Sequence, residues 1–204
     1  MAKKQKQTAN AAVVEKKPER KEEALSETKK EVVNSIFARE RVLTEISDAA
    51  KQLNEQSVFG ILLEDGKVQL SLVEAFYLLE KGRLKIYKTK ERVFTKEEFT
   101  KVAQKLEPNF WVRYVVFKDM RNRGYVVKTA LKFGADFRVY DRGIKPGEDH
   151  AKWILYPVYE SDALTWYEFA AKNRVAHSTK KRLLIGIVDN EDDVTYYEIK
   201  WTRP

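Results

Sequence analysis

The chain has 204 residues, no cysteine, and 39 Lys and Arg against 31 Asp and Glu, which gives a net charge of +8. The lack of thiols excludes disulfides, thiolate nucleophiles and cysteine-based zinc sites, and two histidines leave little for a metal cage. The basic balance favours a polyanionic partner, because lysine and arginine neutralise phosphates and release counterions. Apolar runs such as Leu183 to Val188 are too short to span a membrane, and the lysine-rich start lacks the apolar core of a secretory signal. We therefore expect a soluble, cytoplasmic protein that has no contact with a membrane.

Three regions differ in composition. Residues 1–30 contain no aromatic residue, so they cannot bury enough apolar surface to offset chain entropy, and we expect a disordered charged tail. Residues 31–109 are expected to form an N-terminal mixed α/β domain. It begins at 31–56, where apolar residues at three- and four-residue spacings predict one or two helices.

Strands and turns follow in this first domain. Ser57 to Leu63 reads as a strand, Glu64 to Lys67 carries an Asp-Gly turn signal, and Val68 to Leu70 returns as its partner. A further strand is expected at Leu84 to Tyr87.

Two helix starts carry capping signals. Ser71 with Glu74 forms a capping box for a helix that stops at Gly82, and Thr95 with Glu98 opens a second helix. Together, these strands and helices predict an α+β domain that ends near Pro108.

Residues 110–204 are expected to form a second domain with a central mixed β-sheet flanked by helices, so the whole chain is assigned to the α+β class. We expect, in order, a helix at Trp111 to Arg121, strands at Tyr125 to Lys128, Ala135 to Tyr140 and Trp153 to Val158, a helix at Leu164 to Ala176 with its apolar residues on the sheet, and a hairpin of Arg182 to Val188 with Val194 to Trp201. A bend at 131–134 separates the first two strands.

The strand at 135–140 places a tyrosine on a polar face. Its alternation sends Phe137 and Val139 to one face and Arg138 and Tyr140 to the other, which is not how a core tyrosine is placed. A charged loop then leads to His150, and a lysine and arginine cluster follows at 174–184.

These residues could cleave RNA without a metal ion. The reaction needs a base for the ribose 2'-OH, an acid for the departing 5'-oxygen and a cation for the charge on the phosphate. Tyr140, His150 and Lys181 supply one residue of each kind. Singly, each is more often a packing or solvated residue, so only their combination favours the hypothesis.

The residues alone leave alternatives open. His177 could pair with His150 as acid and base, or it could cap a helix. A magnesium-dependent nuclease is the enzymatic alternative, because carboxylates are the usual magnesium ligands. The candidate carboxylates crowd one segment without a recognisable ligand spacing: Asp136, Asp141, Glu148 and Asp149.

From about Val68 to the C-terminus the chain resembles the archaeal tRNA-splicing endonuclease family. The resemblance rests on His150 and four motifs: LSLVEAFYLLEKG at 70–82, YVVFKDMRNRGYVVKTALKFGADFRVYDRG at 114–143, RVAHSTKKRLL at 174–184 and DDVTYYEIKW at 192–201. The second motif is long and specific.

The resemblance implies removal of introns from precursor tRNA at a bulge-helix-bulge, with neither metal nor cofactor. It implies 2',3'-cyclic phosphate and 5'-hydroxyl ends, with Tyr140 as general base, His150 as general acid and Lys181 as charge stabiliser. Lys180 competes for the lysine role, although strand alternation would send the two side chains apart. Arg174 and Arg203 would bind RNA by holding a bulge base between them.

The resemblance also implies assembly, since the substrate has two cleavage sites and the chain has one copy of the motifs. We expect a homotetramer, or a heterotetramer with a second endonuclease subunit. The last strand, with Tyr197, Ile199 and Trp201, would form a dimer, and an acidic loop with Glu160 and Asp162 would enter a basic cleft of a partner. A non-catalytic structural subunit and an RNA-binding partner of such an endonuclease are the alternatives.

Overall fold

A computed structural model describes residues 31–130 and 134–202. The tail predicted at 1–30, residues 131–133 of the predicted bend, and Arg203 lie outside the described residues. The described residues form one compact unit with two five-stranded sheets. Division of this unit into domains at 109/110 stays a prediction.

The first sheet has the strand order β3-β4-β2-β1-β5, in which only the β1–β5 pair is parallel. Its strands are β1 (Val33–Ala38), β2 (Arg41–Thr44), β3 (Ile61–Leu62), β4 (Val68–Leu70) and β5 (Leu84–Tyr87). Three helices accompany them in the chain: α1 (Asp48–Glu55), α2 (Leu72–Glu80) and α3 (Lys96–Leu106).

The helices predicted over 31–56 are mostly wrong, because the first half of this segment is the β1–β2 hairpin. Val33 and Ser35 are buried while Ile36 is 49% exposed, so the burial has the two-residue period of a strand. Arg39 turns the chain with φ of 58°. Only the second half is helical, where Ser47 accepts a hydrogen bond from the Ala50 N–H at the start of α1.

The strand predicted at 57–63 is reduced to the two residues of β3. The chain before it forms a tight loop in which Gly60 has φ of +63°, and a Cβ there would lie 2.5 Å from the Gln69 carbonyl oxygen. Glycine is therefore required at this position.

Both predicted capping boxes are confirmed. Ser71 and Glu74 begin α2, and Thr95 and Glu98 begin α3, with reciprocal hydrogen bonds between side chain and backbone.

The second sheet has the order β10-β9-β8-β7-β6, and only β8 and β9 are parallel. Its strands are β6 (Val126–Thr129), β7 (Phe137–Tyr140), β8 (Trp153–Tyr159), β9 (Arg182–Val188) and β10 (Val194–Ile199). Helices α4 (Phe110–Asn122) and α5 (Trp166–Ser178) complete this part. The predicted mixed sheet with helices is confirmed, and the fold is α+β.

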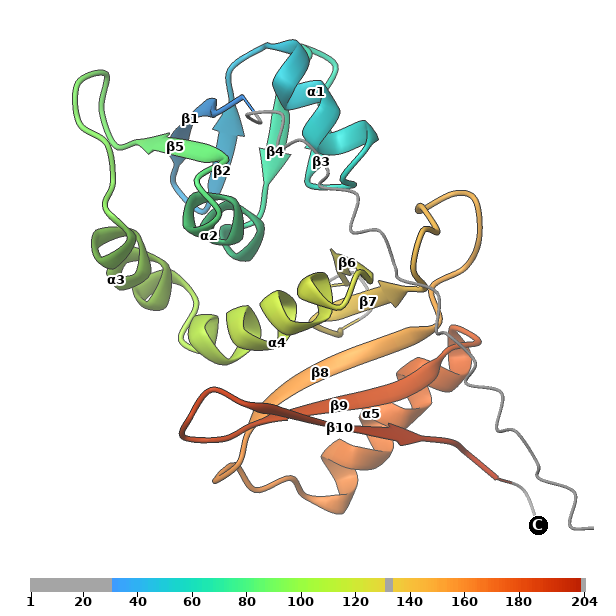
Figure 1. Ribbon diagram of the computed structural model, residues 1–204. Helices are drawn as coiled ribbons and strands as arrows, with labels where there is room; N and C mark the ends of the chain where they lie inside the picture. The colour runs from blue at the N-terminus through green and yellow to red at the C-terminus, as the bar shows by residue number, and fades with distance from the viewer. Residues whose placement is uncertain (1–30, 131–133, 203–204) are drawn as a thin grey trace, which may run out of the picture. The chain divides into compact units, whose positions relative to one another are not determined.

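The two faces of the second sheet belong to different apolar clusters, and Figure 1 shows α4 and α5 on opposite sides of it. On the α4 side, Phe137, Val139 and Leu155 join Val116 in a cluster that also contains core residues of the first sheet. On the α5 side, Ile154 and Leu183 pack with Ala176. The central strands of this sheet are thus buried on both faces.

Helix α5 packs on the second sheet through fewer residues than predicted. Trp166 is 84% and Tyr167 is 78% exposed, so the prediction that these two residues pack on the sheet is wrong. The ring of Trp166 contacts Phe169 of its own helix, with centroids 5.8 Å apart. Contact with the sheet comes from Phe169 and Ala176, which lie two helical turns apart on one stripe.

Candidate functional site

Strand pairing brings the end of β7 and the starts of β8 and β9 to one end of the second sheet. Val139 pairs with Trp153, and the Lys152 N–H donates to the Val139 carbonyl at 2.8 Å. Trp153 in turn pairs with Arg182, whose N–H donates to the Lys152 carbonyl at 3.1 Å. Tyr140 therefore lies in the same region as the residues that enter β8 and β9.

Two of the residues at this end share the sheet face that α5 covers. Arg138 pairs with Ile154, and Ile154 pairs with Leu183, both of which pack under α5. Tyr140 lies two residues after Arg138 on β7, so side-chain alternation directs both to this face, and Lys181, just before β9, lies near enough for the charge of Arg138 to act on its ammonium. Among the described residues, the phenol and two cations therefore converge.

Tyr140 is more buried than its polar strand face suggests. It is 5% exposed, in a cluster with Val58, Val126 and Ala151. Val58, in the loop before β3, covers the Tyr140 side chain, and the sequence did not indicate that this loop lies against β7. The ring also meets a charge, because the Arg138 guanidinium carbon lies 5.9 Å from its centroid.

His150 is exposed and stands three residues before β8. Its backbone N–H donates to the Asp149 carboxylate at 2.6 Å. In the part of the chain that the structure describes, no hydrogen bond of its imidazole is found. The side chain therefore remains accessible to a ligand at the end of the sheet.

Lys181 is half-buried, and its ammonium group donates to the Thr179 carbonyl at 2.8 Å. Partial burial lowers the pKa of Lys181, and the positive charge of Arg138 lowers it further. Lys180 is exposed and has φ of 56°, so the chain turns between the two lysines. Both precede β9, so this turn separates their side chains, and the strand alternation that the sequence suggested does not apply.

The remaining predicted residues lie at or beyond α5. His177, in the last turn of α5, makes an edge contact with the Trp201 ring at 4.8 Å between centroids. Arg174 is exposed on the same helix. Arg203 cannot be placed, because it lies outside the described residues.

Two of the carboxylates considered as magnesium ligands, Asp136 and Asp141, pair with different cations. Asp136 lies 2.9 Å from the Arg113 guanidinium, whereas Asp141 lies 3.1 Å from the Lys152 ammonium. Burial raises the pKa of Asp136 although Arg113 opposes the shift. Across residues 31–130 and 134–202, no group of three or more His, Asp or Glu side chains could hold a metal ion.

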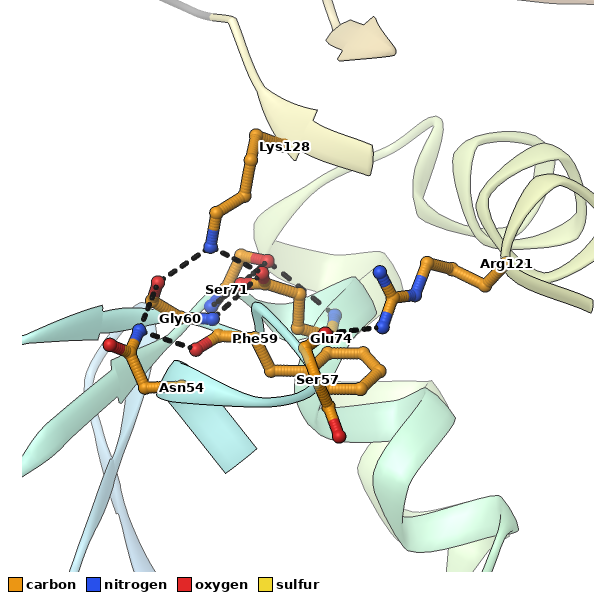
Figure 2. Close-up of polar contacts among 8 residues, drawn as sticks. All are labelled: Asn54, Ser57, Phe59, Gly60, Ser71, Glu74, Arg121 and Lys128. Atoms are coloured by element: carbon orange, nitrogen blue, oxygen red, sulfur yellow. Dashed lines mark hydrogen bonds and ion pairs between the residues drawn. The ribbon is translucent and has the colours of Figure 1, made fainter. Parts of the chain in front are cut away.

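A polar network ties the loop before β3 to β6 (Figure 2). Lys128 donates to the Gly60 carbonyl at 2.6 Å, and its ammonium lies 3.6 Å from the Glu74 carboxylate, which also accepts the Gly60 N–H at 2.9 Å. Asn54 donates to the carbonyls of Phe59 and Gly60. This network holds in place the loop that covers Tyr140. The capping-box pattern identified Glu74, but nothing in the sequence indicated its partner on β6.

Arg121 of α4 holds the other side of the same loop, as Figure 2 shows. It donates to the Ser57 carbonyl at 2.7 Å, and its guanidinium carbon lies 4.0 Å from the centre of the Phe59 ring. Beside it lies a cleft of about 310 Å³ whose lining includes Arg83 and Tyr125. Burial lowers the pKa of both arginines.

The surfaces predicted for assembly are mostly accessible in the single chain, although Ile199 packs against the cluster under α5. β10 is an edge strand of its sheet, and Tyr197 and Trp201 are 56% and 55% exposed. Glu160 and Asp162 form an exposed turn after β8. Among the described helices, none is both long and apolar enough to cross a membrane.

Comparisons with known proteins agree with this arrangement. Residues 33–100 match the N-terminal domain of the tRNA intron endonuclease, and residues 110–196 match its catalytic C-terminal domain. A tRNA-splicing endonuclease of Nanoarchaeum equitans is 47% identical over 155 residues, which cover 72% of this chain and 97% of the relative. A protein of the same name from Methanothermobacter thermautotrophicus is 41% identical, covering 81% and 95%, and one from Pyrococcus abyssi is 37% identical, covering 85% and 99%. The chain therefore belongs to the tRNA intron endonuclease family.

Proposed function

We propose that this chain is a tRNA-splicing endonuclease that cuts precursor tRNA at bulge-helix-bulge junctions, without a metal ion, and leaves 2',3'-cyclic phosphate and 5'-hydroxyl ends. The observation that carries the proposal is the register of β7, β8 and β9, which gathers a phenol and two cations at the sheet end where the loop with His150 enters. Family membership and the names of the relatives support the substrate.

In the proposed mechanism each residue has one role. The phenolate form of Tyr140 accepts the proton of the ribose 2'-OH, and the 2'-oxygen attacks the adjacent phosphorus. The bond from phosphorus to the 5'-oxygen breaks, and His150 donates a proton to that oxygen. Lys181 binds the non-bridging oxygens, where negative charge builds up in the transition state. A proton transfer through solvent from Tyr140 to His150 restores the starting state.

The bases of a bulge are unpaired, so protein side chains can recognise them by stacking. Arg174 is exposed on α5 and could stack its guanidinium plane on an extruded base. Arg203 is the second candidate for this role.

We also propose that the chain assembles, since one copy offers one cleavage site. The edge strand β10 would pair with a second copy, because its backbone groups on one side have no strand partner in the sheet. The turn with Glu160 and Asp162 would enter the cleft that Arg83 and Arg121 line in a partner, which opposite charge favours. The partner would be an identical chain or a second endonuclease subunit.

The test is cleavage of a bulge-helix-bulge RNA by the purified chain in EDTA, with analysis of the product ends. We expect cleavage at both junctions and cyclic phosphate ends. Activity that disappears in EDTA would contradict the metal-free mechanism.

Light scattering and a second polypeptide separate the remaining alternatives. A tetramer that cleaves alone supports a homotetramer. A chain that cleaves only with an added subunit supports a heterotetramer. RNA binding without cleavage in either state would favour the structural subunit or binding partner.

A further inference from the structure

Arg138 lies next to the proposed catalytic residues and has no role in the mechanism above. It is in the middle of β7, opposite Lys128 on β6 and Ile154 on β8. Its Nε atom is buried, and the residue as a whole is half-buried. Within the described residues this Nε has no hydrogen-bond partner, and such a buried donor costs stability unless something outside the chain compensates it.

The neighbouring carboxylates are committed to other cations. Asp136 pairs with Arg113, Asp141 pairs with Lys152, and Glu74 lies beside Lys128. For Arg138 no ion pair with a carboxylate is found among residues 31–130 and 134–202.

Lys181 likewise has no ion pair with a carboxylate among the described residues. Its ammonium donates to a carbonyl, that of Thr179, and the positive charge of Arg138 acts on it across the sheet. Two like charges therefore act on each other, and the described residues provide neither with a carboxylate partner. A bound anion would remove this repulsion and would satisfy donors on both side chains.

We propose that Arg138 is a second ligand of the scissile phosphate, which binds its non-bridging oxygens together with Lys181. The inference rests on the proposed function, because that function brings a phosphate to this end of the sheet. A guanidinium suits the role, since its planar fork can donate two hydrogen bonds to one phosphate. Its distance of 5.9 Å from the Tyr140 ring places the cation beside the group that receives the 2'-OH proton.

The test compares Arg138→Gln and Arg138→Lys with wild type in single-turnover cleavage of a bulge-helix-bulge RNA. We expect Arg138→Gln to lower the maximal rate by about a hundredfold to a thousandfold, which is the range for loss of one donor to a developing charge. Arg138→Lys should recover part of this loss, because it keeps the charge and loses the fork. Affinity for an RNA with 2'-deoxyribose at the cleavage site should change only a few-fold, since many other contacts bind the substrate.

Arg92→Gln is the matched control, because it removes the same charge from an exposed ion pair with Glu98 of α3. It should cleave at the wild-type rate. Thermal unfolding of each variant shows whether a loss of rate reflects a loss of structure.

The outcomes separate the two proposals. A wild-type chain that cleaves, with Arg138→Gln equally fast, would overturn the role of Arg138 and leave the proposed function intact. A variant that lowers affinity but keeps the maximal rate would also overturn it, because Arg138 would then be a general RNA contact. If wild type neither cleaves alone nor with an added subunit, both proposals fail.

Discussion

Lys128 and Arg138 lie opposite each other on neighbouring strands, yet their surroundings differ. The Lys128 ammonium lies 3.6 Å from the Glu74 carboxylate and donates to the Gly60 carbonyl at 2.6 Å, so both of its partners belong to the chain. Arg138 and Lys181 have no carboxylate partner among the described residues. A cation that holds the fold carries its counter-charge in the chain, whereas the cations at the sheet end are suited to an anion that arrives with a substrate.

Between the two sides of this comparison, the larger effect should come from the catalytic side. Lys181→Ala should lower the single-turnover rate about a hundredfold to a thousandfold, because charge on the phosphate then lacks a cation. Stability should hardly change, since the ammonium donates to one loop carbonyl. Cleavage assays and thermal melts measure the two effects.

Lys180→Ala is the matched control for Lys181. Lys180 is exposed and the chain turns between the two residues, so this variant should cleave nearly as fast as wild type. If Lys180→Ala lost most of its cleavage rate while Lys181→Ala cleaved at the wild-type rate, the charge-stabilising role would belong to Lys180.

On the structural side, Lys128→Met should lower the free energy of unfolding by about 3 kcal/mol, because it leaves the buried Glu74 carboxylate without its cation. The side chains of this pair are 12% and 7% exposed. Lys67→Met, in the exposed pair with Asp65, should have a much smaller effect, and urea titrations of both variants measure the difference. Equal effects in the two variants would contradict the structural role of the network.

A smaller, pH-dependent effect is expected at Glu80, which accepts hydrogen bonds from Tyr114 at 2.6 Å and Lys118 at 2.9 Å. Burial alone would raise the pKa of Glu80, but these bonds outweigh it and the pKa is lowered from 4.5. The resulting stability is fully present above the unfolded-state pKa and is lost as the pH falls through the folded-state pKa.

Glu80→Gln should therefore reduce the free energy of unfolding by about 1 kcal/mol at neutral pH. The difference from wild type should shrink as the pH falls below 4.5. Urea titrations at pH 7 and at acidic pH test this, and a difference that persists unchanged in acid would show that the charge of Glu80 is not the cause.

Local patterns in the sequence predicted much of the fold. Capping boxes at Ser71 and Thr95 were found because their signal lies within four residues. The hairpin of β1 and β2 was missed, since apolar residues at 31–46 fit a helical spacing and the pairing with β5 that selects strands is distant in sequence. The exposure of Trp166 was also missed, because the residue types of a helix do not show which of its turns contact the sheet.

The candidate site shows the same limit. The residue types of Tyr140 and Lys181 suggested their roles from the sequence. The burial of Tyr140 under the loop before β3 depends on Lys128 and Arg121, whose partners are more than 50 positions away. Contacts at such separation leave no periodic pattern, so the network and the unpaired charge of Arg138 required the structure.

The most direct test of the account is His150→Ala, since the imidazole is exposed and its loss should leave the fold intact. Single-turnover cleavage of a bulge-helix-bulge RNA in EDTA and equilibrium binding of the same RNA would be measured on both proteins. We expect the variant to bind RNA like wild type and to show no detectable cleavage. A variant that cleaves at the wild-type rate would contradict the account, because the departing 5'-oxygen would then take its proton from another group.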